Sequence, residues 1–323
     1  MKNIVVVGSL NLDLVAYVPR MPVEGETISG TDFAMFPGGK GANQAVAAAR
    51  LGSKVTMVGR LGNDGFGQQL RDGLERNGVG KESVISCEKP TGTAIITVNP
   101  AGGNSIIVIP GANYALSPEA LETHTDVLRS ADVILAQLEI PIETVVRLAE
   151  MAAQLNKPFV LDPAPAQSLP DNLLRNVTWL TPNESETRTI LDHLGYHAEE
   201  DATSEAALEK AAERLLEAGA QNVILKLGAR GVFVAAADGT RRLIEPYRVN
   251  VVDSTAAGDA FNGGFAYGLT QGMTHSEAAQ FACAVAAASV IKVGAQPSMP
   301  TLEEVRNLMH LPLLQKDRSQ KQS

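Results

Sequence analysis

Cysteine is scarce in this chain, with Cys87 and Cys283 as the only two among 323 residues. The two lie far apart in the sequence, so they form neither a metal-ligand pair nor a redox pair of the closely spaced kind. Both are therefore expected to be reduced and buried, which is typical of proteins in a reducing cytoplasm.

Positive charge is also in deficit. The chain has 27 Lys and Arg residues against 36 Asp and Glu residues, and its net charge is −9. Nucleic-acid binding selects for basic surfaces that neutralise phosphates, so this balance argues against a nucleic-acid partner. Length is less restrictive, because 323 residues can bury a large core as one big α/β domain or as two smaller ones.

Long hydrophobic runs are missing as well. The amino-terminal stretch MKNIVVVGSLNLD meets polar residues too early for a signal peptide. Residues 281–293 are the most apolar later stretch, but they are Ala-rich and fall well short of the ~20 residues that span a membrane. They predict a buried helix, and we expect a soluble, cytoplasmic protein with no membrane partner.

What the sequence does contain is a regular alternation of short apolar strands and helical segments. The expected strands are residues 4–7, 55–58, 133–135, 159–161, 179–180 and 223–227, and the Ala-rich helical patterns include 44–51, 142–155 and 205–218. Strands that are apolar on both faces and separated by helices indicate a parallel sheet covered on both sides. The sequence therefore predicts an α/β fold with a three-layer α/β/α core and a mostly parallel sheet.

Two segments interrupt this alternation. Residues 14–36 and 91–110 lack helical patterns and predict hairpins, the second turning at residues 99–104 through Pro and two Gly. We expect them to form a small β-sheet, acting as a lid (residues 14–37 and 91–110). The remaining residues 1–13, 38–90 and 111–314 form the core, and the polar tail, residues 315–323, is expected to be disordered.

The first strand leads into a polar alternation, VVVGSLNLDL. Side chains alternate along a strand, so Ser9, Asn11 and Asp13 share one face and could bind adjacent hydroxyls of a polyol. An ordinary half-exposed strand would give the same pattern. The single glycine here excludes a dinucleotide-binding fingerprint.

A glycine-rich segment, PGGKGANQ at residues 37–44, precedes an Ala-rich helical pattern. It is not a P-loop, because Lys40 is followed by glycine rather than Ser or Thr. Glycines let a ligand approach the backbone, and Lys40 and Asn43 supply donors at a helix start. A plain glycine-rich turn remains the alternative.

Two further motifs follow expected strands. Asn183 and Glu186 lie three residues apart and share a face if a helix starts there, so the acid could hold a hydrated Mg²⁺ near phosphates. A helix cap explains the pair equally well. Residues 226–232, KLGARGV, place two glycines at a strand end, and a β-like run follows at residues 232–236. The segment could surround a nucleotide or form only a tight turn.

The stretch DSTAAGDAFNGGF, residues 253–265, places small residues before an acid at the start of an apolar helix. Free N–H groups at residues 256–258 would point at an incoming anion, and the helix dipole stabilises negative charge. Asp259 could accept the proton of an attacking hydroxyl. An acid that only complements the helix dipole is the alternative.

Taken together and in this order, these motifs resemble those of the ribokinase family of carbohydrate and nucleoside kinases. The strongest are GGKGANQAVAAARLG at residues 38–52 and DSTAAGDAFNGGF, supported by NESE at 183–186 and GAQPS at 294–298. The resemblance covers the chain up to its polar tail. It implies the ribokinase-like fold with a β-sheet lid, and a homodimer formed through that lid.

The resemblance also implies roles for single residues. Asp259 matches the catalytic base, and the N–H groups of Ala256, Ala257 and Gly258 match the anion hole. The matches to sugar-binding positions are Asn11, Asp13, Gly39, Lys40, Asn43, Glu139 and Asp259. The matches to ATP-binding positions are Asn183, Lys226, Leu227, Gly228, Ala229, Arg230, Gly231, Gly258, Asp259 and Cys283.

Two metal ions are implied in the same way. Glu186 matches a residue associated with the Mg²⁺ that accompanies ATP. A K⁺ activator site matches Asp253, Thr255, Ser289, Lys292, Gly294 and Ser298. Lys292 stands where the family commonly has arginine, which is harmless if only its carbonyl is a ligand.

The activity that the resemblance implies is ATP-dependent phosphorylation of the 5-hydroxyl of D-ribose, giving D-ribose 5-phosphate. A sister kinase for deoxyribose, another sugar or a nucleoside is the nearest alternative. A non-catalytic sugar- or nucleotide-binding regulator on the same fold is a third, against which the intact Asp259 and its small-residue surroundings argue.

Overall fold

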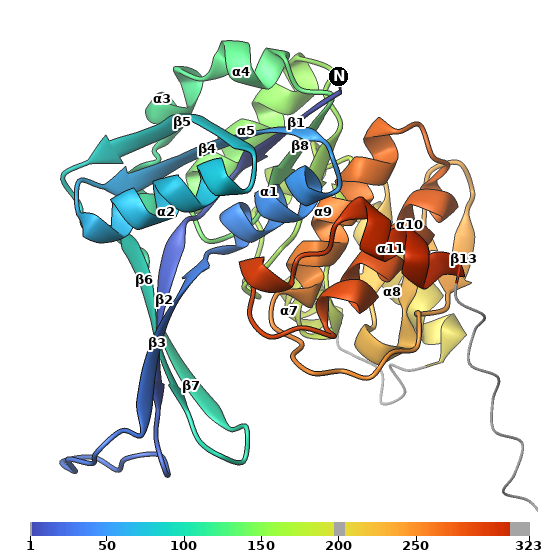
Figure 1. Ribbon diagram of the computed structural model, residues 1–323. Helices are drawn as coiled ribbons and strands as arrows, with labels where there is room; N and C mark the ends of the chain where they lie inside the picture. The colour runs from blue at the N-terminus through green and yellow to red at the C-terminus, as the bar shows by residue number, and fades with distance from the viewer. Residues whose placement is uncertain (1, 197–203, 311–323) are drawn as a thin grey trace, which may run out of the picture.

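The computed structural model describes residues 2–196 and 204–310, and within them it contains two β-sheets (Figure 1). The large sheet has nine strands, in the order β13 (Arg241–Ile244), β12 (Val232–Ala235), β11 (Val223–Lys226), β10 (Trp179–Leu180), β9 (Phe159–Leu161), β8 (Val133–Ala136), β1 (Asn3–Val7), β4 (Lys54–Gly62), β5 (Val79–Cys87). The strands from β5 to β11 pair in parallel, whereas β12 and β13 are antiparallel. The predicted mostly parallel sheet is confirmed, and β5 and β13 are strands that the sequence analysis missed.

Helices cover both faces of this sheet. One face carries α1 (Lys40–Arg50), α2 (Gly65–Arg76), α9 (Ala257–Thr270), α10 (His275–Ser289) and α11 (Leu302–His310). The other carries α3 (Pro118–Glu122), α4 (Thr125–Arg129), α5 (Ile142–Gln154), α6 (Asp171–Leu174), α7 (Glu184–His193) and α8 (Glu205–Glu217). Strand β1 shows why: Ile4 and Val6 pack into the first core and Val5 and Val7 into the second. The three-layer prediction is therefore confirmed.

The small sheet extends away from this body as a separate arm. Its order is β3 (Asp32–Gly38), β2 (Asn11–Tyr17), β6 (Gly92–Val98) and β7 (Asn104–Ile109), with β2 and β6 parallel and the outer pairs antiparallel. Both expected hairpins are present. However, β2 begins at Asn11, so Asn11 and Asp13 belong to the small sheet and not to the exit of the first core strand.

The first turn of α1 packs directly against the chain that leaves β1. Ala42 N–H donates to Ser9 O at 2.9 Å, and a Cβ at Gly41 would lie only 2.6 Å from Ser9 N. Likewise, a Cβ at Gly263 on α9 would lie 2.6 Å from Ala47 Cβ on α1. Gly41 therefore lets α1 lie against the exit of β1, and Gly263 lets α9 lie against α1. Both helices begin near the carboxyl ends of the parallel strands.

Three short 3₁₀ turns complete the described chain: η1 (Gly111–Ala115), η2 (Gly228–Arg230) and η3 (Gln296–Ser298). None of the helices in the described ranges is both long enough and apolar enough to cross a bilayer. The expected disordered tail, residues 315–323, lies outside the described residues.

Candidate functional site

The start of α9 holds a buried carboxylate, as the sequence predicted. Ala256 precedes the helix in the left-handed conformation at φ 58°, which costs a residue with a Cβ roughly 1–2 kcal/mol and is typical of functional sites. Asp259 follows in the first turn and is 5% exposed. Its Oδ2 accepts from Asn43 Nδ2 at 2.9 Å and its Oδ1 from Gln44 Nε2 at 3.1 Å.

The surroundings of Asp259 set its proton affinity. Burial raises its pKa to about 6, because desolvation disfavours the charged form. The Lys40 ammonium opposes this shift, the neighbouring carboxylate of Asp162 adds to it, and the amides of Asn43 and Gln44 oppose it. Asp259 is therefore ionised at neutral pH but holds a proton more readily than an exposed aspartate, as a general base requires.

The strand β2 brings Asn11 and Asp13 to the same place. Asn11 Oδ1 accepts from Asn113 Nδ2 at 2.7 Å, which fixes the orientation of its amide. A Cβ at Gly38 would overlap the carboxylate of Asp13. Burial raises the pKa of Asp13 to about 7, and the charges of Glu139 and Asp259 add to that shift.

Glu139 follows β8 and meets the start of α1. Its Oε2 accepts from Ser9 Oγ at 2.5 Å and from Lys40 N at 3.0 Å, so it also satisfies a free N–H of the helix. Burial would lower the pKa of the Lys40 ammonium, but the charges of Asp259 and Glu139 keep it above its ordinary value. We call Asp13, Lys40, Glu139 and Asp259 the carboxylate cluster: three acids around one cation.

A cavity of about 470 Å³ opens on the other side of the start of α9. Its lining is mostly apolar, from Lys226, Gly228, Ala229, Gly231, Val232, Pro246, Tyr247, Arg248, Val249, Val251, Ser254, Ala257, Gly258, Phe261, Cys283, Ala286, Ala287 and Val290. We call it the apolar cavity. Burial raises the pKa of the Cys283 thiol to about 12, so this thiol is neutral at physiological pH.

The residues expected at the nucleotide thus divide into two groups. Lys226, Gly228, Ala229, Gly231, Gly258 and Cys283 line the apolar cavity, whereas Asn183, Leu227, Arg230 and Asp259 do not. Gly258 and Asp259 are consecutive, so one helix start contributes to the apolar cavity and to the carboxylate cluster at once.

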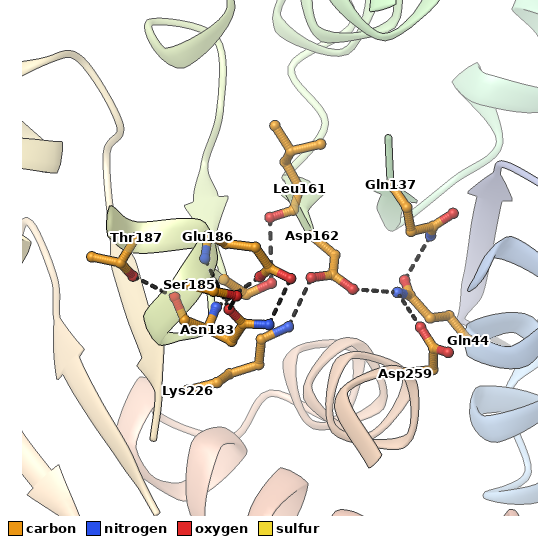
Figure 2. Close-up of polar contacts among 11 residues, drawn as sticks. Gln44, Gln137, Leu161, Asp162, Asn183, Ser185, Glu186, Thr187, Lys226 and Asp259 are labelled. Carbon is orange, nitrogen blue, oxygen red and sulfur yellow. Dashed lines mark hydrogen bonds and ion pairs between the residues drawn. The ribbon is translucent and has the colours of Figure 1, made fainter. Parts of the chain in front are cut away.

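Asn183 and Glu186 form a capping box at the start of α7, the alternative that the sequence left open (Figure 2). Glu186 N–H donates to Asn183 Oδ1 at 2.9 Å, and Glu186 Oε2 accepts from Asn183 N at 2.7 Å. Burial raises the pKa of Glu186, although nearby Lys226 opposes the shift. A cap does not exclude a second role, because Glu186 also lies close to the charge of Lys226.

The residues expected around potassium lie in the loop before α9 and in the segment that runs from the end of α10 to η3. Asp253 Oδ1 accepts from Thr255 N at 2.9 Å and its Oδ2 from Gly294 N at 2.8 Å, so one carboxylate joins both loops. Ser289 and Ser298 instead donate to nearby carbonyls, those of Ala286 and Ala295, each at 2.8 Å.

The side chain of Lys292 turns outward to Glu304, with Nζ 2.5 Å from Oε1. Only the carbonyl of Lys292 could therefore face a cation between the loops, which is the condition under which its replacement of arginine is harmless. Within the described ranges no group of three or more His, Cys, Asp or Glu side chains is arranged to hold a metal.

The anion hole expected at residues 256–258 is partly engaged by the protein. Ala257 N–H donates to Ser254 O at 3.2 Å, a long bond that leaves this donor only weakly held. Gly258 belongs to the first turn of α9, whose N–H groups have no intrahelical partner. The start of the helix is therefore suited to an anion.

Sequence reasoning missed three polar residues beneath this site: Gln44, Gln137 and Asp162, all buried. Gln44 stands next to Asn43 in a motif already noted, and Asp162 directly follows the apolar strand at residues 159–161. Ligands of open α/β sheets bind at the carboxyl ends of strands, so a polar residue at such an end was a usable signal.

The family model described as pfkB family carbohydrate kinase matches residues 1–302. Among described proteins, ribokinase from Haemophilus influenzae is 38% identical over 94% of this chain and 97% of its own length. Ribokinase from Bacillus subtilis is 39% identical over 96% of this chain and 100% of its own. Deoxyribokinase from Salmonella typhi is 36% identical over 96% and 99%, respectively.

Solved structures of ribokinases are also similar to this chain. Ribokinase from Thermotoga maritima has a TM-score of 0.88 at 39% identity, covering 96% of this chain and 99% of that one. Ribokinase from Arabidopsis thaliana, complexed with ribose and ATP, has a TM-score of 0.89 at 33% identity over 96% and 99%. The deoxyribokinase is nearly as similar in sequence as the ribokinases, so overall identity does not by itself identify the sugar.

Proposed function

Because this chain belongs to the pfkB family of carbohydrate kinases, we propose that it transfers the γ-phosphoryl group of ATP to the 5-hydroxyl of D-ribose. One observation carries the proposal. The start of α9 places Gly258 on the wall of the apolar cavity and Asp259 in the carboxylate cluster. A phosphoryl donor and a hydroxyl acceptor bound on these two sides would meet at the same helix start.

The residues there match the needs of phosphoryl transfer. Asp259 would accept the proton of the attacking hydroxyl, with its carboxylate oriented by Asn43 and Gln44. The N–H groups at the start of α9 and the helix dipole would stabilise the negative charge on the transferred group. Lys40 would add a positive charge beside Asp259 and the transferred group.

Magnesium would enter with the nucleotide and neutralise phosphate charge when bound. A hydrated Mg²⁺ keeps several waters, so a buried acid at the edge of the site can hold it through them. Glu186 fits such a role because its carboxylate is buried near the carboxylate of Asp162, and a cation there would offset the negative charge of both acids.

The choice of sugar rests on Asn11 and Asp13, which we propose bind ribose hydroxyls. A buried polar group that loses its hydroxyl partner is left unsatisfied, so a substrate lacking that hydroxyl is penalised. The test is a panel of D-ribose, 2-deoxy-D-ribose, other sugars and nucleosides with ATP, measured by ADP release. D-ribose should give the highest kcat/KM, whereas equal or better use of deoxyribose would assign the sister activity.

Potassium activation is a second part of the proposal. A cation held by the loops that Asp253 joins would fix the segment leading to Ala256 and Asp259, and anion-hole donors act best when already positioned. A weakly hydrated ion suits a site of carbonyl oxygens. Initial rates in potassium should exceed those in sodium at equal ionic strength, and Asp253→Ala should reduce the difference. Identical rates would leave the loops as simple turns.

The small sheet carries an apolar face suited to a second copy of the chain. Phe33, Met35, Ile95, Ile107 and Ile109 share this face and are 41–60% exposed. We propose a homodimer through it. Light scattering should give twice the 34.1 kDa chain mass, and Ile107→Asp should shift the protein toward monomer while Met309→Asp on α11 should not. A monomeric wild type would contradict this interface.

A further inference from the structure

A series of polar side-chain contacts runs from Lys226 to Asp259 (Figure 2), and Lys226 lines the apolar cavity. Lys226 Nζ lies 2.7 Å from Asp162 Oδ1, and Asp162 Oδ2 accepts from Gln44 Nε2 at 2.9 Å. The same Gln44 nitrogen donates to Asp259 Oδ1 at 3.1 Å. Two carboxylates therefore share one amide nitrogen.

The orientation of that amide is determined by a second glutamine. Gln44 Oε1 accepts from Gln137 Nε2 at 2.7 Å, so the Gln44 nitrogen must face the carboxylates. Gln44, Asp162 and Asp259 are 0%, 2% and 5% exposed, so solvent screens the interaction between the two acids only weakly.

Lys226, at the other end of this series of contacts, lies where the phosphates of the nucleotide are expected. Lys226 lines the apolar cavity, and its Nζ would lie 3.5 Å from a Cβ placed on Gly258. The Lys226 ammonium thus stands beside the start of α9. Asp162 does not line the apolar cavity, and Lys226 is its contact with the cavity wall.

We propose that Asp162 is a positioning residue for phosphoryl transfer, holding Asp259 through Gln44 and the ammonium at the start of α9 through Lys226. The inference rests on the proposed kinase function. When a phosphoryl group attracts Lys226, Asp162 loses part of its counter-charge and repels Asp259 more strongly. Asp259 then becomes a stronger base when the nucleotide is in place.

Other charges act on the same groups. Asp259 faces Lys40 from α1, Asp162 after β9 and Asp13 from β2. Asp162 in turn faces Lys226, Glu186 and Lys40. Lys40 and Asp13 stay unchanged in the Asp162 and Lys226 variants. A shift of the kcat–pH profile in those variants therefore reports on the contacts between Lys226, Asp162, Gln44 and Asp259.

The experiment compares the pH dependence of kcat in the full-length wild type, Asp162→Asn, Lys226→Met and the double variant, with ribose and ATP saturating. Asp162→Asn removes a negative charge, so its acidic limb should move to lower pH by roughly half a unit or more. Lys226→Met leaves Asp162 unneutralised, so its limb should move to higher pH. The double variant should follow Asp162→Asn, because the charge that Lys226 neutralised is gone.

Two further readouts separate positioning from simple stability. Asp162→Asn should lower kcat about tenfold with a small change in the KM for ribose, since a misoriented base slows the reaction and leaves sugar binding intact. Asp132→Asn is the matched control: Asp132 also pairs with a lysine, Lys2 at 3.0 Å, but precedes β8 at the opposite end of the sheet. It should leave kcat and the pH profile unchanged.

The outcomes distinguish the two levels of the proposal. If the wild type is active and neither single variant shifts the acidic limb of the kcat–pH profile, the role of Asp162 is overturned and the kinase function still stands. If Asp162→Asn does not fold, the direction of the Lys226→Met shift decides alone. A wild type inactive on every acceptor of the panel would overturn both.

Discussion

The carboxylate cluster and the apolar cavity lie on two sides of one helix start, but the first is formed by charged side chains and the second mostly by apolar ones. The first gathers three acids and a lysine, of which Asp259 is buried and the other three are half-buried, and burial raises the pKa values of Asp13 and Asp259. The second is lined by small and apolar side chains such as Val232, Phe261 and Cys283.

The difference indicates how each side recognises its ligand. Buried polar groups discriminate sharply, because every missing hydroxyl leaves a donor or acceptor unsatisfied. An apolar wall recognises shape and flat aromatic surface, and one methylene more or less changes binding only modestly. We therefore expect changes in the carboxylate cluster to reduce catalysis and sugar selection strongly, and changes in the apolar cavity to alter nucleotide affinity mildly.

The largest effect should come from Asp259→Asn. This variant keeps the shape but cannot accept the proton, so kcat should fall by about 10²-fold or more. Binding of ATP should survive, because Asp259 does not line the apolar cavity. Steady-state kinetics and calorimetric titration of ATP test both halves, and near-wild-type turnover would remove Asp259 from the mechanism.

Asp13→Ala should have the next largest effect, on sugar discrimination. Loss of a hydrogen bond to a charged group costs about 1.5–3 kcal/mol, so kcat/KM for ribose should fall by roughly ten- to a hundredfold. The preference for ribose over deoxyribose should narrow. Asp32→Ala, an exposed aspartate on β3 of the same sheet, is the control and should change neither value. An unchanged preference in Asp13→Ala would place sugar selection elsewhere.

The third largest effect is expected from pH, on kcat/KM for ribose. Asp259, with a pKa of about 6, must be deprotonated to act as a base, and Asp13, with a pKa of about 7, loses its charge as pH falls. Activity should therefore decrease as pH falls from 8 through about 7 and 6, at up to roughly tenfold per unit for each essential group. A profile flat to pH 5 would contradict both assignments.

The smallest effect is expected on the apolar side. Cys283→Leu adds volume to the cavity wall and should raise the KM for ATP by about tenfold, with little change in kcat or in ribose KM. Cys283→Ala, which only removes volume, should stay within about threefold of wild type. A large loss of kcat in Cys283→Ala would mean that the two sides are not as different as their composition indicates.

Much of this architecture was predictable from the local pattern of apolar and small residues in the sequence. Short strands apolar on both faces indicated a parallel sheet between two helical layers, and the residues of β1 divide between two cores as expected. The motif around Asp259 indicated a helix start with an acid in its first turn, which α9 has. Such features depend on residues close in sequence, whose spacing is visible without the fold.

The less predictable part involved pairs distant in sequence. Asn11 and Asp13 alternate as expected, but their strand pairs with β3 and β6 and not with the core sheet, a choice that hydrogen bonding across the fold decides. Asp162 looked like an ordinary residue after a strand. Its partners, Gln44 and Lys226, lie 118 and 64 positions away.

By itself, the sequence determined the class of fold and the helix starts with their glycines, because these follow from periodicity and local backbone chemistry. Only the tertiary structure decided which charges share a site. The approach of α1 and α9, possible because Gly263 has no side chain, brings Asp259 against Asn43 and Gln44. Proton affinity depends on burial and on neighbouring charges within a few ångströms, and those distances exist only in the folded chain.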